Sequence, residues 1–434
     1  MTVSWTDHIK IPTFALFKNP NMLFYIIAGL VIVSFLVEVF LEYLNSTRRS
    51  TELPPELKEI YDVDKYRKSV EYEKTRHRFS LLRGSFSLAI ILAMLLFGGF
   101  ALIDNLAREL SSNTILITLL FFGIIMLGSD LLHIPFDWYG TFVIEEKFGF
   151  NKSTPRIFII DKFKGWMLGI IIGGVLLGLI TWFYYLTVEW FWIYALGLIA
   201  AFMVFMNLFY SSLIVPLFNR QTPLEDGELR QEISALSQRA GFDLDDVFVI
   251  DGSKRSTKAN AYFSGLGKRK RIVLFDTLID ELSVGNILGV LAHEIGHYKK
   301  RHIISNMAVS LLTTALTLYL LSLMVSNPAL SEALGAKQPS FHMGLIAFGI
   351  LYSPVSAILG LITNWISRKN EYEADRFAAE NHSVKDLADA LKKLSVKNLS
   401  NLRPHPAYVF VHYSHPPLLK RLQALKQAEE GNRD

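Results

Sequence analysis

Long runs of apolar residues, separated by polar segments, dominate the pattern of this chain. A helix needs about 20 consecutive apolar residues to cross a bilayer. Seven stretches approach or exceed this length: residues 22–44, 85–103, 114–134, 166–186, 190–218, 303–325 and 344–365. The pattern predicts a mostly α-helical integral membrane protein with seven transmembrane helices.

Lys and Arg gather on one side of this predicted membrane layout. With the loops assigned alternately to the two sides, 40 of the 44 Lys and Arg lie in the segments 45–83, 135–165, 219–302 and 366–434. Basic loops remain in the cytoplasm, so we expect the N-terminus outside and these four segments inside. A missed or false span would destroy this separation, so the charge pattern independently supports the number seven.

The segment between the fifth and sixth spans has a different character from the apolar runs. Its residues alternate between amphipathic, β-rich and turn-forming stretches, which is typical of a compact soluble domain. The predicted elements are a surface helix at 225–240 that ends at Gly241, a strand at 247–251, a hairpin of 259–264 and 271–275 around Gly265-Leu266-Gly267, and a helix from about Ser283 through 299–301 into the sixth span.

Composition narrows the classes of function. Of the 434 residues 51% are apolar and 19% are charged, whereas soluble domains carry roughly 25% charge. There are no cysteines, which excludes disulfides, thiolate metal sites and a cysteine nucleophile. The net charge of +4 is too mild to indicate a nucleic-acid-binding protein.

The helix predicted before the sixth span contains His293-Glu294-Ile295-Gly296-His297. Histidines at positions i and i+4 share one helical face and can bind one metal ion. Neutral imidazoles suit Zn²⁺, and Glu294 lies where it can take a proton from a water molecule at the metal. The alternative is an ordinary polar turn at the membrane boundary.

A catalytic zinc also needs a third protein ligand and an open position. Cysteine is absent and no further histidine has a suitable spacing, so we expect a carboxylate. Glu371 and Asp375 follow the seventh span on the same side and share one helical face, whereas Glu373 points elsewhere. One of the pair would bind zinc and the other would accept a hydrogen bond from a ligand histidine. Alternatively, these acids only begin a solvated helix.

These features together resemble the type I CAAX prenyl endopeptidases, a family of seven-span zinc proteases that remove C-terminal tripeptides from prenylated proteins. The resemblance covers about residues 20–425. It rests on the segments 143–152, 216–219, 260–263, 293–297, 367–368 with 371–375, and 414–417 with Arg421. The HtpX-type membrane proteases share the zinc motifs, but they have fewer spans and lack the 143–152 segment, which makes them a weaker match.

The resemblance implies a role for each residue of the site. It assigns His293, His297 and Glu371 as zinc ligands and Glu294 as the catalytic base. It implies that Asp375 either holds a ligand histidine or donates a proton. It implies that His415 and Arg421 stabilise the oxyanion, unless they only anchor the last helix. A strand that holds an extended peptide would be formed by Asn260, Ala261, Tyr262 and Phe263, unless this is an ordinary hairpin strand.

The fold implied by the resemblance is a barrel of seven helices around a water-filled chamber, with a small α+β zinc protease domain. Glu38 and Asp130, two carboxylates inside predicted spans, would then face the chamber unless they lie close to the interface. We expect a membrane domain at 1–218, the first part of the protease domain at 219–302, two spans at 303–365 and the rest of the protease domain at 366–434.

The resemblance implies one zinc ion per chain, a peptide or protein substrate with a prenylated C-terminus, contact with the lipid bilayer and no nucleic acid. The membrane would be the cytoplasmic membrane of a bacterium or the endoplasmic reticulum of a eukaryote, with the site on the cytoplasmic side. Two other hypotheses remain open at this point. One is a bacterial protease of HtpX-like role that removes damaged membrane proteins, and the other is a seven-span receptor or transporter with a non-catalytic metal site.

Overall fold

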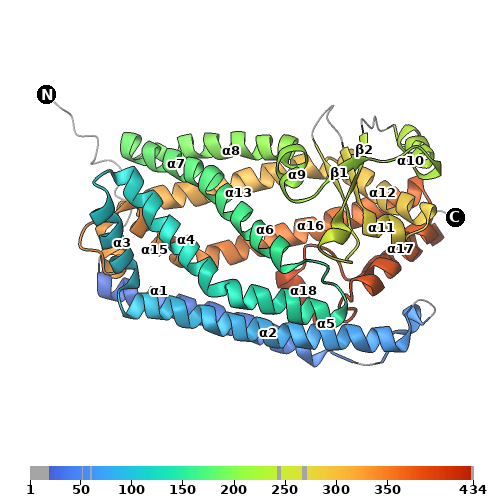
Figure 1. Cartoon of the computed structure of the whole chain (residues 1–434), viewed down its shortest axis with the longest axis horizontal. Coiled ribbons are helices and arrows are strands. Elements are labelled where there is room, and N and C mark those ends of the chain that lie inside the picture. The colour runs from blue at the N-terminus through green and yellow to red at the C-terminus, as the bar shows by residue number, and fades with distance from the viewer. Residues whose placement is uncertain (1–18, 51, 59–60, 242–245, 266–270, 432–434) are drawn as a thin grey trace.

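The computed structural model describes residues 19–50, 52–58, 61–241, 246–265 and 271–431. The described chain is mostly helical, with a small sheet at one end of an elongated bundle (Figure 1). Among the described residues six helices are long and apolar enough to cross a membrane, and the number is seven if one bent helix pair forms a single span. The expected fold class, a helical membrane protein with a small α+β domain, is therefore confirmed.

The helices that contribute to the spans follow one another along the chain, some of them joined through π-helical turns. They are α1 (Pro20–Thr47), α2 (Val63–Leu96), α4 (Thr114–Tyr139), η4 (Gly140–Glu145), α5 (Glu146–Phe148), α6 (Pro155–Leu168), η5 (Gly169–Gly173), α7 (Gly174–Thr187), α8 (Phe191–Phe209), η6 (Tyr210–Ile214), α9 (Val215–Phe218), α13 (His302–Met324), α15 (Phe341–Leu351) and α16 (Ser353–Asn381).

The remaining helices are shorter, and most belong to the soluble part. They are η3 (Pro55–Leu57), α3 (Gly99–Leu110), α10 (Glu228–Arg239), η7 (Gly252–Lys254), α11 (Asp276–Glu281), α12 (Val284–Lys299), α14 (Pro328–Ala333), α17 (Val384–Lys397), α18 (Pro406–His412) and α19 (Leu418–Gly431). The strands are β1 (Gln221–Pro223), β2 (Asp246–Ile250), β3 (Ala261–Ser264) and β4 (Arg271–Phe275).

The second span begins earlier in the chain than the apolar run predicted. Asp62 caps α2 by accepting a hydrogen bond from the Asp64 backbone N–H at 3.0 Å, and the helix then runs through the charged stretch to Leu96. Gly98, with a φ of 68°, turns the chain into α3. The prediction of 85–103 was therefore wrong at its C-terminal end, because hydropathy does not register a tight turn inside an apolar run.

The predicted continuous helix from Ser283 into the sixth span is also wrong. Arg301 has a φ of 58°, and this left-handed residue separates α12 from α13. The seventh span is likewise broken, since α15 and α16 meet at an angle of 57°. Pro354 lies in the first turn of α16, where its missing N–H is tolerated.

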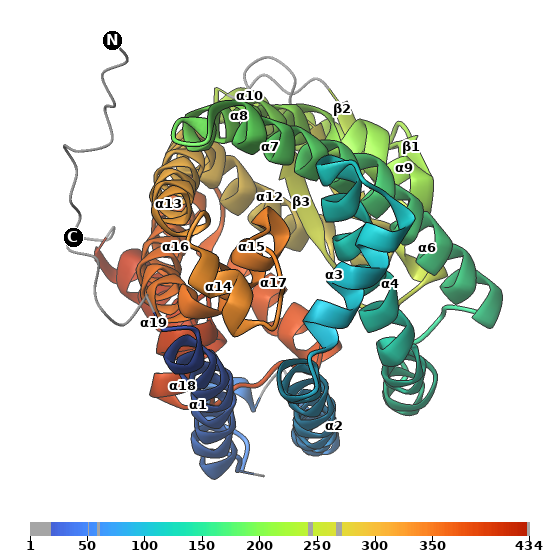
Figure 2. The ribbon, with the colours of Figure 1, turned by 90° about the vertical axis from the view of Figure 1, so that its left-hand side faces the viewer.

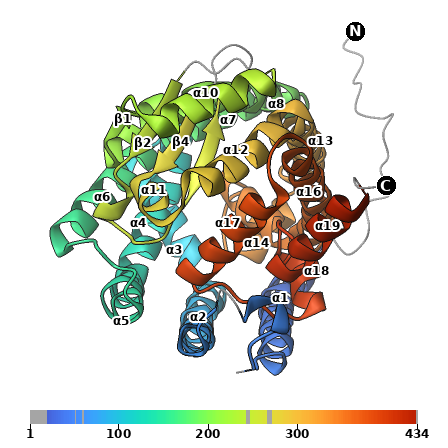
Figure 3. The same ribbon diagram turned by 90° about the vertical axis from the view of Figure 1, so that its right-hand side faces the viewer.

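The membrane helices form a barrel when the molecule is viewed along its long axis (Figure 2). At the end nearest the viewer, α14 and α15 lie inside this ring and pack against α1 through a core that includes Leu23, Ile27 and Leu330. The other end carries the sheet together with α10, α11, α12, α17 and α19 (Figure 3). The site-bearing elements therefore lie at one end of the barrel.

The two carboxylates noted inside the spans both face cavities. Asp130 of α4 accepts hydrogen bonds from Lys162 Nζ and Trp166 Nε1 of α6, each at 2.8 Å. Glu38 of α1 is 53% exposed, lies 3.5 Å from His412 and lines a separate polar cavity.

The sheet has the strand order β1-β2-β4-β3. β3 and β4 pair antiparallel, as the hairpin prediction required, although Leu266 and Gly267 of the predicted turn lie outside the described residues. β2 joins β4 in parallel, and the three-residue β1 was not anticipated. Within the described residues β3 lies at the edge of this sheet, with β4 as its neighbouring strand.

One hydrophobic core unites the soluble elements. It contains Ile272 and Leu291 from the segment 219–302 together with Ala378 and Leu387 from the segment 366–434. The two segments, which are separated by the last membrane spans in sequence, thus fold against each other around α12.

Candidate active site

The helix α12 carries the HExxH sequence and is held tightly between its neighbours. Ser283 begins the helix as an N-cap, with its Oγ accepting from the Asn286 backbone N–H at 3.4 Å. Near the other end, a Cβ on Gly296 would lie 3.1 Å from both the Cα and the carbonyl oxygen of Ala374 in α16. A glycine at this position lets the two helices approach closely, and this brings Glu371 towards the histidines.

His293, His297 and Glu371 converge at this contact. The Nε2 atom of His297 lies 3.1 Å from Nε2 of His293 and 3.2 Å from Oε1 of Glu371. The His293 Nε2 atom lies 3.5 Å from Oε2 of Glu371. Within the described ranges, no other group of three or more His, Asp or Glu converges in this way.

The separations fit a bound divalent metal. Zn–N bonds of about 2.0–2.1 Å at tetrahedral angles place neighbouring ligand atoms roughly 3.3 Å apart, close to the separations found between the two imidazoles and Glu371. The Glu371 Oε2 atom is buried and makes no hydrogen bond with any described residue, which suits a carboxylate oxygen that binds a metal ion. Two imidazoles and one carboxylate form the donor set of a catalytic zinc site.

Asp375 and Arg421 contact His293 and Glu371 and hold them in position. Asp375 Oδ1 lies 2.9 Å from Nδ1 of His293, which directs the opposite ring nitrogen towards Glu371. Arg421 Nε donates to Asp375 Oδ2 at 2.8 Å, and its Nη1 lies 3.5 Å from Glu371 Oε2. Burial alone would lower the pKa of His293, but the bonds to Asp375 and Glu371 raise this pKa to about 9. All these side chains are buried.

His302 and Glu373 form a second chain of contacts that the sequence did not reveal. His302 Nδ1 lies 3.0 Å from Nδ1 of His297, and its Nε2 lies 3.2 Å from Oε2 of Glu373. His302 is buried at the start of α13. The break between α12 and α13 at Arg301 therefore places His302 beside His297. Glu373 points away from Glu371, as its helical position indicated.

Glu294 and His415 lie at the more accessible side of the cluster. Glu294 is half-buried on α12, next to His293. His415 Nε2 lies 3.3 Å from Glu371 Oε1, although 64% of the His415 side chain is exposed. The Ser414 hydroxyl contacts His415 Nδ1 at 2.9 Å, which holds the ring in this orientation.

The strand predicted to hold substrate lies beside α12. Asn260 precedes β3, and its carbonyl accepts from the Phe275 backbone N–H at 3.1 Å, while its side chain is exposed. Ala261 and Tyr262 pair with β4 on one side only, and the Phe263 ring contacts Tyr298 of α12 with a centroid distance of 5.6 Å. The edge strand β3 therefore contacts α12, the helix that carries Glu294.

Comparisons with known proteins identify the architecture. Residues 42–220 match the sequence model described as CAAX prenyl protease N-terminal, five membrane helices, and residues 223–429 match peptidase family M48. CAAX prenyl protease 1 of Saccharomyces cerevisiae is 36% identical over 437 residues, covering 94% of this chain and 96% of the relative. The chain belongs to peptidase family M48.

Other relatives of this M48 peptidase agree with that assignment. The mouse CAAX prenyl protease 1 homolog is 34% identical and aligns with 88% of this chain and 90% of its own length. The crystal structure of S. mikatae Ste24p superposes with a TM-score of 0.88 at 36% identity, covering 93% of this chain and 99% of that one. The family resemblance in the sequence is thus confirmed, and the protein is a membrane metalloprotease, which disfavours the receptor or transporter hypothesis.

Proposed function

We propose that this M48 peptidase is a zinc endopeptidase that removes the C-terminal tripeptide from prenylated proteins. The observation that carries the proposal is the convergence of His293, His297 and Glu371 on one point. Glu294 is on the same helix as the two histidines, and this helix contacts the edge strand β3. The names of the relatives, CAAX prenyl protease 1 in yeast and mouse, support the class of substrate.

Each residue at the accessible side has a distinct task in this reaction. Zinc, held by both histidines and Glu371, would polarise the scissile carbonyl and acidify a water molecule. Glu294 takes a proton from the attacking water and passes it to the leaving nitrogen. His415 presents Nε2 near Glu371, where it donates a hydrogen bond to the carbonyl oxygen as negative charge develops.

Asp375 and Arg421 act as positioning residues in this proposal. Asp375 selects the ring orientation and tautomer of His293. The Arg421 guanidinium is buried and directed at Asp375 and Glu371, so its hydrogen-bonding capacity serves these carboxylates. This differs from the direct oxyanion role that the family resemblance implied for Arg421.

The substrate would lie extended along β3, held by backbone hydrogen bonds to the Asn260–Phe263 stretch. The segments 219–302 and 366–434 would together form the protease domain. We place them on the cytoplasmic side, in the cytoplasmic membrane of a bacterium or the endoplasmic reticulum of a eukaryote. They belong to the four segments that hold 40 of the 44 Lys and Arg, and basic loops remain in the cytoplasm.

Cleavage of a farnesylated peptide by the purified, zinc-loaded protein tests the proposal. Mass spectrometry should show one cut directly after the farnesylated cysteine, which a chelator abolishes and added zinc restores. The same peptide without the lipid is the matched control and should react more slowly. Cleavage of unfolded membrane proteins without any cleavage of the farnesylated peptide would instead favour the quality-control role.

A further inference from the structure

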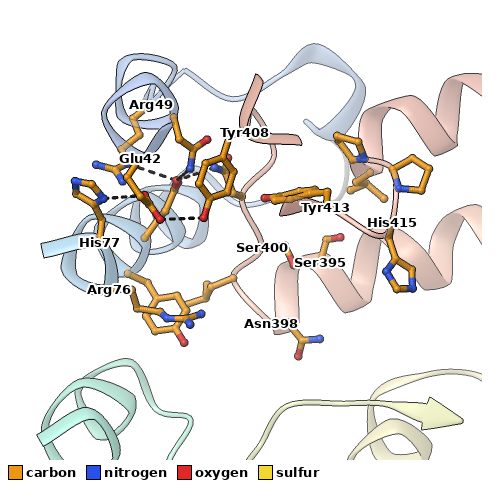
Figure 4. A pocket seen from close by; sticks show the side chains of 18 of the residues that line it. Glu42, Arg49, Arg76, His77, Ser395, Asn398, Ser400, Tyr408, Tyr413 and His415 are labelled. Carbon is orange, nitrogen blue, oxygen red and sulfur yellow. Dashed lines mark hydrogen bonds and ion pairs between the residues drawn. The ribbon is translucent and has the colours of Figure 1, made fainter. Parts of the chain in front are cut away.

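A polar cavity of about 710 Å³ lies beside the cluster of His293, His297 and Glu371. Figure 4 shows side chains that line this cavity. Its walls come from α1, α2, the end of α17 and the segment around α18. His415 and Arg421 line it, so the cavity is continuous with the accessible side of the site. Its volume falls within the range of about 300–1,000 Å³ found for ligand-binding pockets.

The carboxylates deep in this cavity already have partners. Glu42 lies 2.8 Å from His77 Nδ1 and accepts from the Tyr408 hydroxyl at 2.9 Å. Glu73 accepts from Asn401 Nδ2 at 2.7 Å, and Glu38 lies at the half-exposed end of the cavity near His412. Figure 4 draws the contacts of Glu42 with His77 and Tyr408 at one side of the cavity. The contacts of these carboxylates are therefore within the wall of the cavity.

Two arginines in the wall lack a full set of anionic partners. Arg76 is exposed and lies over the Tyr72 ring at 5.6 Å, with no ion pair to any described residue. Arg49 Nη2 is buried without a hydrogen-bond partner in the described part of the chain, and Arg49 Nε lies 3.5 Å from Glu73. Figure 4 shows Arg76 and His415 on opposite sides of the cavity. A free guanidinium at this place favours binding of a carboxylate.

The direction of β3 indicates which end of a peptide would enter the cavity. Lys258, three residues before β3, lines the cavity and donates to Glu145 at 2.8 Å. Asn398, also in the wall, pairs with both backbone groups of Ala259 at 3.3 and 3.4 Å. A peptide that pairs antiparallel with β3 has its C-terminal end at this start of the strand. The opposite polarity would send that end towards Ser264, which does not line the cavity.

We propose that this cavity receives the residues that follow the scissile bond and that Arg76 binds the carboxylate of the substrate's last residue. The inference rests on the proposed function, because it needs a peptide cut close to its C-terminus. Three extended residues reach about 10 Å, and we place the carboxylate of the third residue at Arg76, on the side of the cavity opposite His415. Binding of the substrate's C-terminal carboxylate thereby sets the cleavage site three residues from the C-terminus.

A pair of farnesylated peptides that differ only at the C-terminus, carboxylate in one and amide in the other, tests this recognition. We expect the wild-type protein to prefer the carboxylate peptide about tenfold or more in kcat/KM, as for other hydrogen-bonded charge pairs. Arg76→Ala should lose most of this preference by slowing only the carboxylate peptide. Arg78→Ala is the matched control, because Arg78 is exposed on the same helix and lines a different groove.

Inhibition by the released tripeptide gives a second measurement, in which the varied C-terminus belongs to the inhibitor and the cleaved substrate is the same throughout. The tripeptide acid should inhibit the wild-type and Arg78→Ala proteins more strongly than its amide, and Arg76→Ala should treat both alike. Equal cleavage of the two peptides by the wild type, a preference retained in Arg76→Ala, or an equal loss on both peptides would overturn the inference alone. If the zinc-loaded wild type cleaves neither peptide, the proposed function itself fails and the inference falls with it.

Discussion

Replacing Gly296 with alanine should loosen the metal site while leaving the protein folded. The added Cβ would lie 3.1 Å from the Ala374 Cα and carbonyl oxygen and 3.1 Å from the Phe377 Cβ, closer than ordinary van der Waals contact. The helices α12 and α16 must then move apart. Overpacking of this kind costs about 1–3 kcal/mol, and the better helix propensity of alanine offsets about 1 kcal/mol. The free energy of unfolding should therefore fall by roughly 0–2 kcal/mol.

The metal affinity should respond more strongly than the stability. Glu371 lies one helical turn before Ala374, so the same displacement lengthens its separations from His293 and His297, now 3.5 and 3.2 Å. We expect zinc affinity to fall about 10- to 100-fold, the usual penalty for disturbing the groups that orient a ligand. Competition with a chromophoric chelator measures this affinity.

Gly360→Ala provides the control for this experiment. Gly360 also lies on α16, but an added Cβ there meets nothing within 4 Å, so its zinc affinity should match the wild type. Unchanged affinity in Gly296→Ala, or an equal loss in both variants, would refute the argument that close packing of α12 on α16 builds the site.

Two further predictions concern the groups behind the ligands. His302→Phe should weaken zinc binding about 10- to 100-fold, because it removes the 3.0 Å contact with His297 Nδ1; wild-type affinity in the chelator assay would contradict this. Zinc affinity should also rise about tenfold per pH unit from 7 towards 9, because zinc must displace the proton of His293. Burial lowers the pKa of His293, but its hydrogen bonds with Asp375 and Glu371 raise this pKa to about 9. That proton stabilises the metal-free fold fully below pH 6.5, the ordinary pKa of histidine, and this contribution is lost as the pH rises through about 9. An affinity that levels off above pH 6.5, or a metal-free protein whose thermal stability does not decline towards pH 10, would exclude the effect.

The sequence predicted the features that depend on spacing within one element. The i,i+4 geometry placed His293 and His297 together, and the glycine-containing turn between two β-rich segments predicted the β3–β4 hairpin. The choice between Glu371 and Asp375 was open from spacing alone, because both share one face of α16. What separates them in the structure is a contact over long sequence distance, the Arg421 guanidinium of α19 bound to Asp375.

The predicted helix boundaries were wrong where the backbone conformation of a single residue ends the helix. The turn at Gly98 lies inside an apolar stretch, so hydropathy does not indicate the break there. At the break between α12 and α13 the left-handed residue is Arg301, which is not a glycine, so turn chemistry does not indicate that break either. The role of His302 depends on that break, and for this reason the sequence assigned it none. The polar cavity is built from four distant segments, which no local pattern connects.

Glu294→Gln offers the most direct test that the cluster is a hydrolytic metal site. The amide is nearly isosteric, so both histidines should still bind zinc, but it cannot accept a proton from water at neutral pH. We predict zinc content equal to that of the wild type together with a loss of peptide cleavage of at least about 10²–10⁴-fold, measured on the same purified protein. Cleavage close to the wild-type rate with zinc fully bound would contradict the role of Glu294 as general base and the proposed mechanism with it.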